Sequence, residues 1–528
     1  MLSQMALRER LERLNAIGIA LSGETDTARL TESILLAAKH LVRADAGTLY
    51  RIRDGALHFE IVLTDSLGLA MGGSSGRDIS LPPVPLRGAD GAPNLHNVIA
   101  CAVNQGGTIV IDDAYTALGY DFSGTRRFDA ANGYRSTSFL CVPMRNHEGE
   151  LIGALQLINA LDDDGAVRAF DDDDRKLVES LASQAAIALT NRQLIASLEE
   201  LFESFIGLIN LAIDDKSPYT SGHCQRVPEL TMMLAEAASR TRTGPLAEFG
   251  MSDKDRYELK IAGLLHDCGK VTTPVHVVDK ATKLQTIFDR IALIETRYEV
   301  LRRDIEIARL RGEIGDAEAT ARLAAQADDL AFLRAVNLGG EAMHDADVER
   351  VWRIASAAWQ GPRGLAPLLS DDEVENLTVR RGTLTAAERQ IINHHIEVTI
   401  QMLEALPWPK HLRNVPEYAG GHHERMDGRG YPRGLTREQM SVQARVMGIA
   451  DVFEALTARD RPYKPGMKLS QSLGILARMA RDQHVDVDLF EVFVRERVWA
   501  EYATQFLPAE QIDAVDVEAL VAIARGHG

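Results

Sequence analysis

A long helical pattern divides this chain of 528 residues into two parts. Residues 175–213 contain no proline, and Gly207 is their only glycine, so little in this stretch interrupts a helix. Before it, β-branched and aromatic runs mark strands, whereas after it strand signals nearly vanish. A chain of this length exceeds a single hydrophobic core. We therefore expect a multidomain fold: an α/β domain, a connecting helix and an all-α domain.

The part before this helix has the pattern of an antiparallel sheet with flanking helices. Apolar residues at helical spacing predict a helix over residues 30–42. Short, partly alternating apolar runs predict five strands, and residues 147–150 are the expected hairpin turn between the last two. The predicted strands cover residues 47–53, 57–63, 107–112, 137–144 and 151–159.

Three stretches of this part resemble GAF domains. They read DAGTLYRIRDG (45–55), GYRSTSFLCVPM (133–144) and GELIGALQLINA (149–160). The resemblance implies that residues 1–190 form a sensor domain. Domains of that family bind cyclic nucleotides or other small molecules, or hold a dimer together.

The members that bind cyclic nucleotides share a further motif, which is incomplete here. It consists of Asn-Lys, then a Phe, then Asp-Glu after three residues. Asn159, Phe170 and Asp174 match, but Ala160 and Arg175 stand in place of the lysine and the glutamate. A structural role or a different small-molecule ligand is therefore favoured over a cyclic nucleotide.

The connecting helix carries an apolar seam. Apolar residues recur in steps of four and three, namely Leu194, Leu198, Leu201, Phe205, Leu208 and Ala212. This is a heptad pattern. The alternative interpretation is a helix that packs against the core of its own chain. We expect the helix to form a homodimer and to transmit the state of the sensor domain.

Composition and charge exclude several classes. The formal net charge of −18 argues against non-specific nucleic-acid binding. No apolar run reaches the roughly 18 residues that span a bilayer, and the amphipathic N-terminus lacks a signal-peptide core. The four cysteines form no C-x-x-C pair and are expected to be reduced thiols. We therefore expect a cytoplasmic protein without a membrane or nucleic-acid partner.

Histidines and carboxylates recur at five separate places in the helical part. The most conspicuous is GHHERMDGRGYP (421–432), where two adjacent histidines precede a glycine-rich loop. The full set is His223, the pair His266 and Asp267, His395, the pair His422 and His423, and Asp451. A single His-Asp pair is more often a hydrogen-bonded core pair than a metal site. Five such groups together favour a metal site, because imidazoles and carboxylates bind first-row metals well.

Two S/T-x-x-D/E sequences place part of this set on helices. Ser252 with Asp255, and Thr385 with Glu388, fit capping boxes. They predict helix starts at about residues 253 and 386. The first of these helices leads into LLHDCGK, and the second carries INHHIEVT.

The donor set suits two octahedral metals such as Fe or Mn better than a structural zinc. Asp267 is the candidate bridge between them. Two such metals activate water and neutralise the oxygens of a phosphodiester. Lys270 lies one helical turn from His266 and can face the same pocket. Arg461 and Lys464 add positive charge, and their spacing leaves open whether they line the pocket or are solvated.

Residues 215–280 and 383–500 resemble HD-GYP domains, a branch of the HD phosphohydrolases. The resemblance rests on HDCGK, HHERMDGRGYP and DVFEALTARDRPY. It implies that residues 214–528 form an HD-type domain with a helical insertion at about 281–379, whose role as a partner surface is only a hypothesis. Members that are enzymes hydrolyse cyclic di-GMP to pGpG or GMP with two or three iron or manganese ions.

The resemblance also implies roles for individual residues. The metal ligands carried over are His223, His266, Asp267, His395, His422, His423 and Asp451. Asp267 and Lys270 take catalytic roles, and the substrate contacts are Lys270, Arg461, Lys464 and Tyr431. The loop with Tyr431 is either a wall of the pocket or a docking surface.

Some positions depart from the family pattern. Members with a third metal carry a glutamate where this chain has Tyr219, so we expect two metals. The family pattern places a glycine four residues after the ligand histidine. Aligned on that pattern, His395 rather than its neighbour His394 is the expected ligand, and Thr399 stands in the position of the glycine. Cys268 replaces an aliphatic residue and is expected to be a buried small hydrophobe.

The leading hypothesis is a phosphodiesterase of cyclic di-GMP that the GAF domain regulates. A phosphodiesterase of another cyclic dinucleotide stays open, because no base-reading residue is identifiable. A different class is a catalytically silent receptor of the dinucleotide, or a module that docks to a diguanylate cyclase. The complete ligand set favours catalysis. The expected partners are cyclic di-GMP, a second copy of the chain and a small molecule in the GAF domain.

Overall fold

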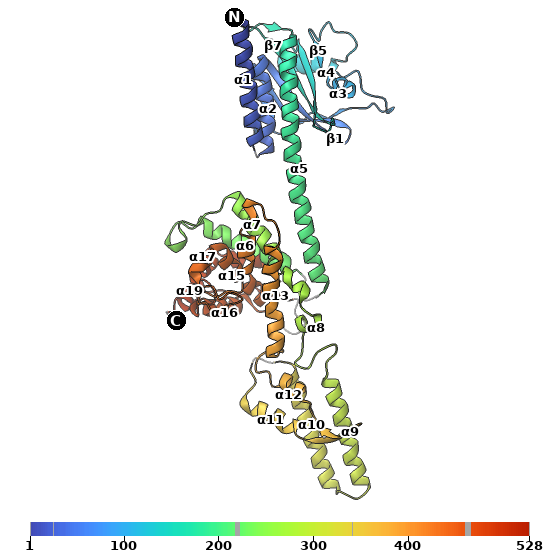
Figure 1. The fold of residues 1–528 in the computed structure, drawn as a ribbon, viewed down its shortest axis with the longest axis vertical. Coiled ribbons are helices and arrows are strands. Elements are labelled where there is room, and N and C mark those ends of the chain that lie inside the picture. Colours follow the sequence, from blue (N-terminus) through green and yellow to red (C-terminus); the bar gives the residue numbers. More distant parts are fainter. Residues whose placement is uncertain (1, 25, 217–221, 340–341, 460–465, 527–528) are drawn as a thin grey trace. The chain divides into compact units, whose positions relative to one another are not determined.

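The computed structural model describes residues 2–24, 26–216, 222–339, 342–459 and 466–526. The chain divides into two compact units, Met1–Leu201 and Phe202–Gly528. Figure 1 shows strands and helices in the first unit and mainly helices in the second. Within the described ranges, no helix is long and apolar enough to cross a bilayer.

The first unit contains an antiparallel sheet whose strand order is β3-β2-β1-β7-β6-β5. In chain order its strands are β1 (Ala44–Arg53), β2 (Ala56–Thr64), β3 (Leu69–Gly72), β4 (Val84–Pro85), β5 (Ile109–Ile111), β6 (Phe139–Arg145), β7 (Leu151–Leu161) and β8 (Val167–Arg168). The short strand β4 pairs with β2, and β8 pairs with β7. The five predicted strands correspond to β1, β2, β5, β6 and β7, and the predicted hairpin joins β6 to β7.

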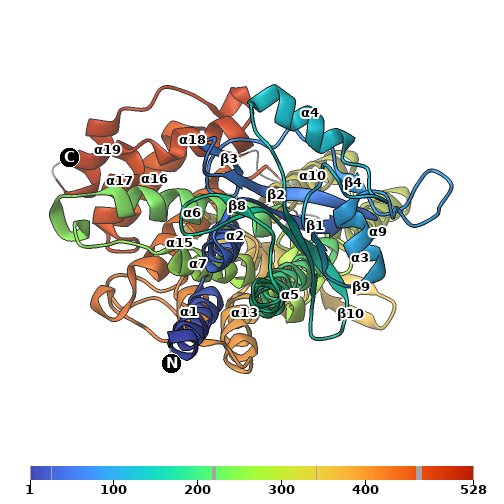
Figure 2. The same ribbon diagram turned by 90° about the horizontal axis from the view of Figure 1, so that it is seen from above.

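Helices cover both faces of this sheet (Figure 2). They are α1 (Leu2–Gly23), α2 (Thr27–Val42), α3 (Val98–Gln105), α4 (Ser123–Asn132) and the first part of α5 (Asp172–Lys216). Alternate residues of a strand point to opposite faces. Leu49 of β1 therefore packs in the core with α1, α2 and α5, whereas its neighbour Tyr50 packs in the core with α3. The predicted helix over 30–42 is confirmed as α2, which Asp26 caps.

Helix α5 is 45 residues long and continues from the first unit into the second. The seam residues lie outside both cores: Leu194, Leu198, Leu201, Phe205 and Leu208 are 51–63% exposed. In the second unit the same helix buries Ile206 and Ile213 on another face. The seam residues therefore contribute to neither of the two cores.

The core of the second unit consists of helices. They are α6 (His223–Arg240), α7 (Asp253–Leu265), α8 (Val275–Val278), α13 (Ala386–Glu404), α14 (Val415–Gly420), α15 (Val442–Thr457), α16 (Leu469–Arg481), α17 (Val487–Arg495), α18 (Val498–Phe506) and α19 (Val517–Ala524). Short 3₁₀ turns lie between some of these helices, namely η1 (Gly244–Leu246), η2 (Cys268–Thr272), η3 (Lys410–Leu412), η4 (Arg437–Gln439) and η5 (Ala509–Gln511). The two predicted helix starts are confirmed, because α7 begins at Asp253 and α13 at Ala386, each with a complete capping box.

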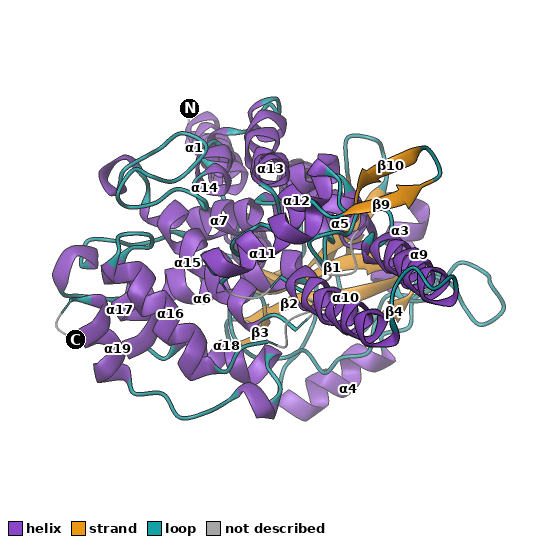
Figure 3. Ribbon diagram, turned by 90° about the horizontal axis from the view of Figure 1, so that it is seen from below, coloured by secondary structure: helices purple, strands orange, loops and turns teal. Residues whose placement is uncertain are grey.

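A segment between α8 and α13 has a small core of its own, which includes Leu284, Ile294, Leu333 and Leu377. Its elements are α9 (Ile291–Leu310), α10 (Asp316–Asn337), α11 (Asp345–Ala355), β9 (Ala358–Gly361), β10 (Gly364–Pro367) and α12 (Asp371–Leu377). The sequence predicted helices only, and the hairpin β9-β10 was missed because each strand has only four residues (Figure 3).

Candidate metal centre

The predicted ligands come from five places in the second unit and meet at one site. His223 begins α6, His266 ends α7, Asp267 precedes η2, His395 lies within α13, His422 and His423 follow α14, and Asp451 lies within α15. Helix α6 packs against both α7 and α15, and α13 packs against η2 and α14. The packing of these helices therefore brings together residues that are far apart in the sequence.

The first group of donors is His223, His266 and Asp267, all buried. The Nε2 atom of His223 lies 3.1 Å from Asp267 Oδ2 and 3.4 Å from His266 Nε2. Asp451 adds a second carboxylate, with its Oδ1 atom 3.3 Å from His223 Nε2. The donor atoms of His223, His266 and Asp267 lie within 4.8 Å of one another, so this group could hold one metal ion.

The second group is His395, His422 and His423, whose donor atoms also lie within 4.8 Å of one another. The Nε2 atoms of His395 and His423 are 3.2 Å apart. His422 Nε2 is buried without a hydrogen-bond partner among the described residues. A buried polar atom without a partner is costly in a folded protein. A cation between these imidazoles would satisfy it.

Asp267 lies between the two groups. Its Oδ2 atom faces His223 and His266, whereas its Oδ1 atom lies 3.3 Å from His395 Nε2. The Oδ1 atom is buried and accepts no hydrogen bond from the described residues. One carboxylate therefore offers a different oxygen to each group, as a bridging ligand of two metals does.

The charge states of His422, His423 and Asp267 suit cation binding. Burial lowers the pKa of His423 to about 4, and burial together with His423 holds the pKa of His422 well below its usual range. Both imidazoles are therefore neutral at pH 7 and keep a lone pair for a metal. Burial acts to raise the pKa of Asp267, but Lys270 and His266 outweigh it and hold that pKa well below its ordinary value.

Lys270 forms an ion pair with Asp267, with 2.5 Å between Nζ and Oδ2. It lies in the 3₁₀ turn η2 rather than on the helix that leads to His266. Burial acts to lower the pKa of Lys270, and the carboxylates of Asp267 and Asp451 outweigh it, so the pKa is raised. The side chain is therefore a fixed positive charge at the edge of the two groups.

Three of the imidazoles are oriented by backbone carbonyl groups of their own helices. The Nδ1 atoms of His266, His395 and His422 lie 2.7, 2.5 and 2.7 Å from the carbonyl oxygens three residues earlier in the chain. A hydrogen bond at Nδ1 places the lone pair on Nε2. In all three residues, Nε2 is the atom that faces the other donors.

The glycine-rich loop closes one side of the site. The ring of Tyr431 stacks on His423, with ring centres 4.9 Å apart. Gly430 approaches the preceding chain so closely that a Cβ atom there would lie 2.3 Å from the nitrogen of Arg425. Glu424 is buried and accepts hydrogen bonds from the backbone of Arg433 and Leu435, which fixes the loop.

The structure describes some of the remaining residues that the sequence analysis singled out, and others lie in the ranges that it does not describe. His394 is exposed and pairs with Glu397, whereas His395 is buried in the second group. Cys268 is buried in the hydrophobic core. Tyr219, Arg461 and Lys464 lie outside the described residues, and so do the predictions that concern them.

The sequence did not predict two buried carboxylates near the site, Glu424 and Glu454. Glu454 contacts His223, with 2.5 Å between Oε2 and Nδ1. It stands one helical turn after Asp451, and this i to i+3 spacing was the available signal. Glu424 lies inside the conspicuous GHHERMDGRGYP stretch, but nothing local distinguishes it from a solvated glutamate.

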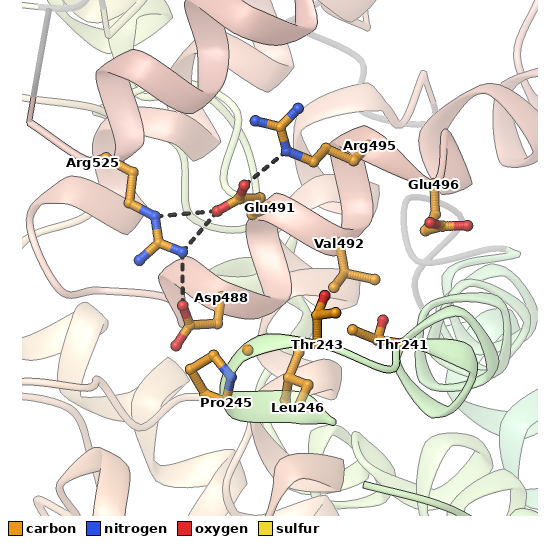
Figure 4. A pocket seen from close by; sticks show the side chains of 11 residues that line it. Thr241, Thr243, Pro245, Leu246, Asp488, Glu491, Val492, Arg495, Glu496 and Arg525 are labelled. Carbon is orange, nitrogen blue, oxygen red and sulfur yellow. Dashed lines mark hydrogen bonds and ion pairs between the residues drawn. The ribbon is translucent and has the colours of Figure 1, made fainter. Parts of the chain in front are cut away.

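A hollow of about 250 Å³ lies elsewhere in the second unit, between α17 and the 3₁₀ turn at 244–246 (Figure 4). Two arginines line it. Arg525 pairs with Asp488 at 2.8 Å and with Glu491 at 2.7 Å, and Arg495 pairs with Glu491 at 2.7 Å. Because carboxylates neutralise both guanidinium groups, this hollow does not offer the unpaired positive charge that a phosphate needs.

Family models match both units. The model of the GAF domain matches residues 26–189. Two models, each of an HD domain, match residues 220–333 and 340–489. The chain combines a GAF domain with an HD domain. The HD-GYP resemblance agrees with these matches, since the His-Asp pair and the Gly-Tyr-Pro loop both lie within the HD domain.

Curated relatives match mainly short parts of the chain. The 3'3'-cGAMP-specific phosphodiesterase 1 of Vibrio cholerae is 44% identical over 15% of this chain and 19% of its own length. The 3'3'-cGAMP-specific phosphodiesterase 3 of the same organism is 24% identical over 58% of this chain and 41% of its own. A cyclic di-GMP phosphodiesterase of Pseudomonas aeruginosa is 35% identical over 25% of this chain and 32% of its own. The chain thus spans less than half the length of these relatives.

Proposed function

We propose that this protein is a metal-dependent phosphodiesterase that opens a cyclic dinucleotide, with cyclic di-GMP as its substrate and pGpG or GMP as its product. The single observation that carries the proposal is the position of Asp267, with one oxygen toward each group of histidines. The printed names of the relatives, which include phosphodiesterases of cyclic di-GMP and of 3'3'-cGAMP, support the substrate class.

In this proposal His223, His266 and Asp451 hold one metal, and His395, His422 and His423 hold the other, with Asp267 shared. Two divalent metals at such a site supply charge stabilisation for a phosphoryl group and activate water. Fe or Mn fits the mixed imidazole and carboxylate donors. The protein's own contribution is to hold these donors in place, so that no reorganisation is needed during the reaction.

Lys270 and Tyr431 are the described residues that would meet the substrate. Hydrolysis breaks one P–O3′ bond of the ring: the oxygen of a water molecule bonds to phosphorus, O3′ leaves with a proton as a hydroxyl group, and the diester becomes a 5′-phosphomonoester. The ammonium group of Lys270 is placed to donate a hydrogen bond to that phosphate. Tyr431, stacked on His423, forms a wall against which a base or ribose can pack. Arg461 and Lys464 keep their proposed role as phosphate contacts.

The test combines metal analysis with product chromatography. Protein loaded with Fe or with Mn is incubated with cyclic di-GMP under reducing and under oxidising conditions, and 3'3'-cGAMP is run in parallel. We expect about two metals per chain and conversion of cyclic di-GMP to pGpG or GMP. Faster turnover of 3'3'-cGAMP than of cyclic di-GMP would show that 3'3'-cGAMP is the preferred substrate. Two bound metals with both dinucleotides left intact would instead favour the silent receptor or a docking module for a diguanylate cyclase.

Contacts at the end of α5 support regulation by the GAF domain. The Nδ2 atom of Asn210 donates to the carbonyl of Leu264 at 3.0 Å. The ammonium group of Lys216 donates to the carbonyls of Lys270 and Val271. These carbonyls flank His266 and Asp267. A shift of α5 would therefore act on the backbone that carries the bridging carboxylate.

The GAF domain holds a cavity of about 400 Å³ that could take a small-molecule ligand. Tyr50, Tyr134 and Gln156 line it, and Tyr50 donates to Gln156 at 2.8 Å. The residues of the incomplete nucleotide motif have other contacts. Asn159 bonds to the backbone of Arg135, and the buried Asp174 pairs with Arg168. Asn159 and Asp174 therefore stabilise the domain in this chain.

We also propose a cytoplasmic homodimer that forms through the α5 seam. Replacement of Leu198 by glutamate is expected to weaken the dimer at least about 100-fold, because it places an unpaired charge in the seam. Sedimentation at micromolar concentration would show a monomer. The matched control is Leu118→Glu, at a residue that is 92% exposed and lies away from α5. A wild-type protein that is monomeric under the same conditions would refute the dimer.

A further inference from the structure

His223 differs from the other oriented imidazoles of the metal centre. His266, His395 and His422 each use a carbonyl oxygen three residues earlier. His223 is the first residue of α6, and the residue three positions before it lies outside the described residues. Its Nδ1 atom instead lies 2.5 Å from Oε2 of Glu454, which is 231 residues away in the sequence.

Glu454 is itself held in place on several sides. It is 1% exposed and lies on α15, one turn after Asp451, so both carboxylates face α6. The guanidinium group of Arg226 donates to Oε1 of Glu454 at 2.7 Å. Arg226 thus holds in place the buried carboxylate that faces Nδ1 of His223.

We propose that Glu454 is a positioning residue that orients His223 and makes it a stronger ligand than the imidazoles bound to carbonyl groups. The inference rests on the proposed metal centre and adds to it an asymmetry between the two metals. A charge-assisted hydrogen bond is stronger than one to a neutral carbonyl and raises the basicity of the imidazole. The metal held by His223, His266 and Asp451 therefore depends on Glu454, whereas the metal held by the other three histidines does not.

The variant that tests this is Glu454→Gln, which keeps the size of the side chain and removes its charge. Metal-free protein is titrated with Mn²⁺, and free Mn²⁺ is measured by electron paramagnetic resonance. We expect the affinity of one site to fall by about 10- to 100-fold, the range for loss of an outer-shell carboxylate, with the other site unchanged. Glu454→Asp, which keeps the charge, should restore part of the loss.

The matched control is Glu501→Gln, because Glu501 is exposed on α18 and far from the ligands in the sequence. It should bind both ions as the wild type does. Circular dichroism of the metal-free proteins shows whether each variant is folded. If Glu454→Gln does not fold, Arg226→Gln takes its place, since it removes the support of Glu454 and should weaken the same site.

The outcomes separate this inference from the proposed function. Wild-type protein that binds fewer than two Mn²⁺ ions would refute the metal centre itself. Wild-type protein with two sites, together with a folded Glu454→Gln variant that binds both ions with wild-type affinity, would overturn only the role of Glu454. Equal weakening of both sites would also overturn it, because the inference predicts a loss at one.

Discussion

Replacement of Asp267 by asparagine is expected to lower kcat/KM for the proposed cyclic dinucleotide substrate at least about 1000-fold, because the two proposed metals would lose their shared ligand. Asparagine keeps the shape of the side chain but offers only one oxygen. The Oδ2 atom of Asp267 faces His223 and His266, and Oδ1 faces His395. Metal content per chain is measured together with the rate, and both are expected to fall.

The same substitution also affects folding, so the experiment must separate a loss of metal from a loss of stability. Asp267 is also the ion-pair partner of Lys270, and loss of one member of a buried pair costs about 3–5 kcal/mol. The metal content is therefore measured on protein shown to be folded by circular dichroism. Asp304→Asn, on an exposed residue of α9, is the matched control and should retain rate and metals. A folded Asp267→Asn protein with both metals would contradict the bridge.

Replacement of Gly269 by alanine is expected to destabilise the HD domain by roughly 3 kcal/mol and to separate the two groups of ligands. A Cβ atom at this position would lie 2.0 Å from the carbonyl oxygen of His395 and 2.6 Å from the nitrogen of Thr399. Both are backbone atoms, so no side chain can move aside. The contact between η2 and α13 sets the distance between Asp267 and His395, and the variant should therefore also lose metal.

Denaturant unfolding of the metal-free protein measures the first effect, and Mn²⁺ titration measures the second. The matched control is Gly474→Ala in α16, where the nearest atom to a new Cβ is a side-chain nitrogen of Arg478 at 3.7 Å. That change should stabilise the protein by about 0.5–1 kcal/mol, because alanine has the better helix propensity. Wild-type stability and metal affinity in Gly269→Ala would show that η2 and α13 can separate without consequence.

The two capping boxes show what local chemistry predicts well. Ser252 and Thr385 each precede a helix that begins within one residue of the expected position. A cap acts over three residues, so its signal is complete in the sequence. The same holds for α2 and for the longer strands, where the period of the apolar residues reflects burial on one face. The hairpin β9-β10 has too few residues to carry such a period.

The candidate site was predictable as a set of residues but not as an arrangement. The family resemblance and the donor types indicated all seven proposed ligands. They did not show that the oxygens of Asp267 face different groups, or that Lys270 pairs with this carboxylate. Those facts depend on how α7, η2 and α13 pack, and that packing involves residues more than 100 positions apart.

The sequence by itself determined the two-domain order, the long helix between the domains and the chemistry of the donors, because periodicity, caps and residue types are local properties. Only the tertiary structure decided that Asp267 faces both groups of histidines, that the α5 seam lies outside both cores, and that Glu454 contacts His223. Each is a contact, or the absence of one, between segments far apart in the chain, and such contacts arise from the packing of whole helices rather than from any pattern along the sequence.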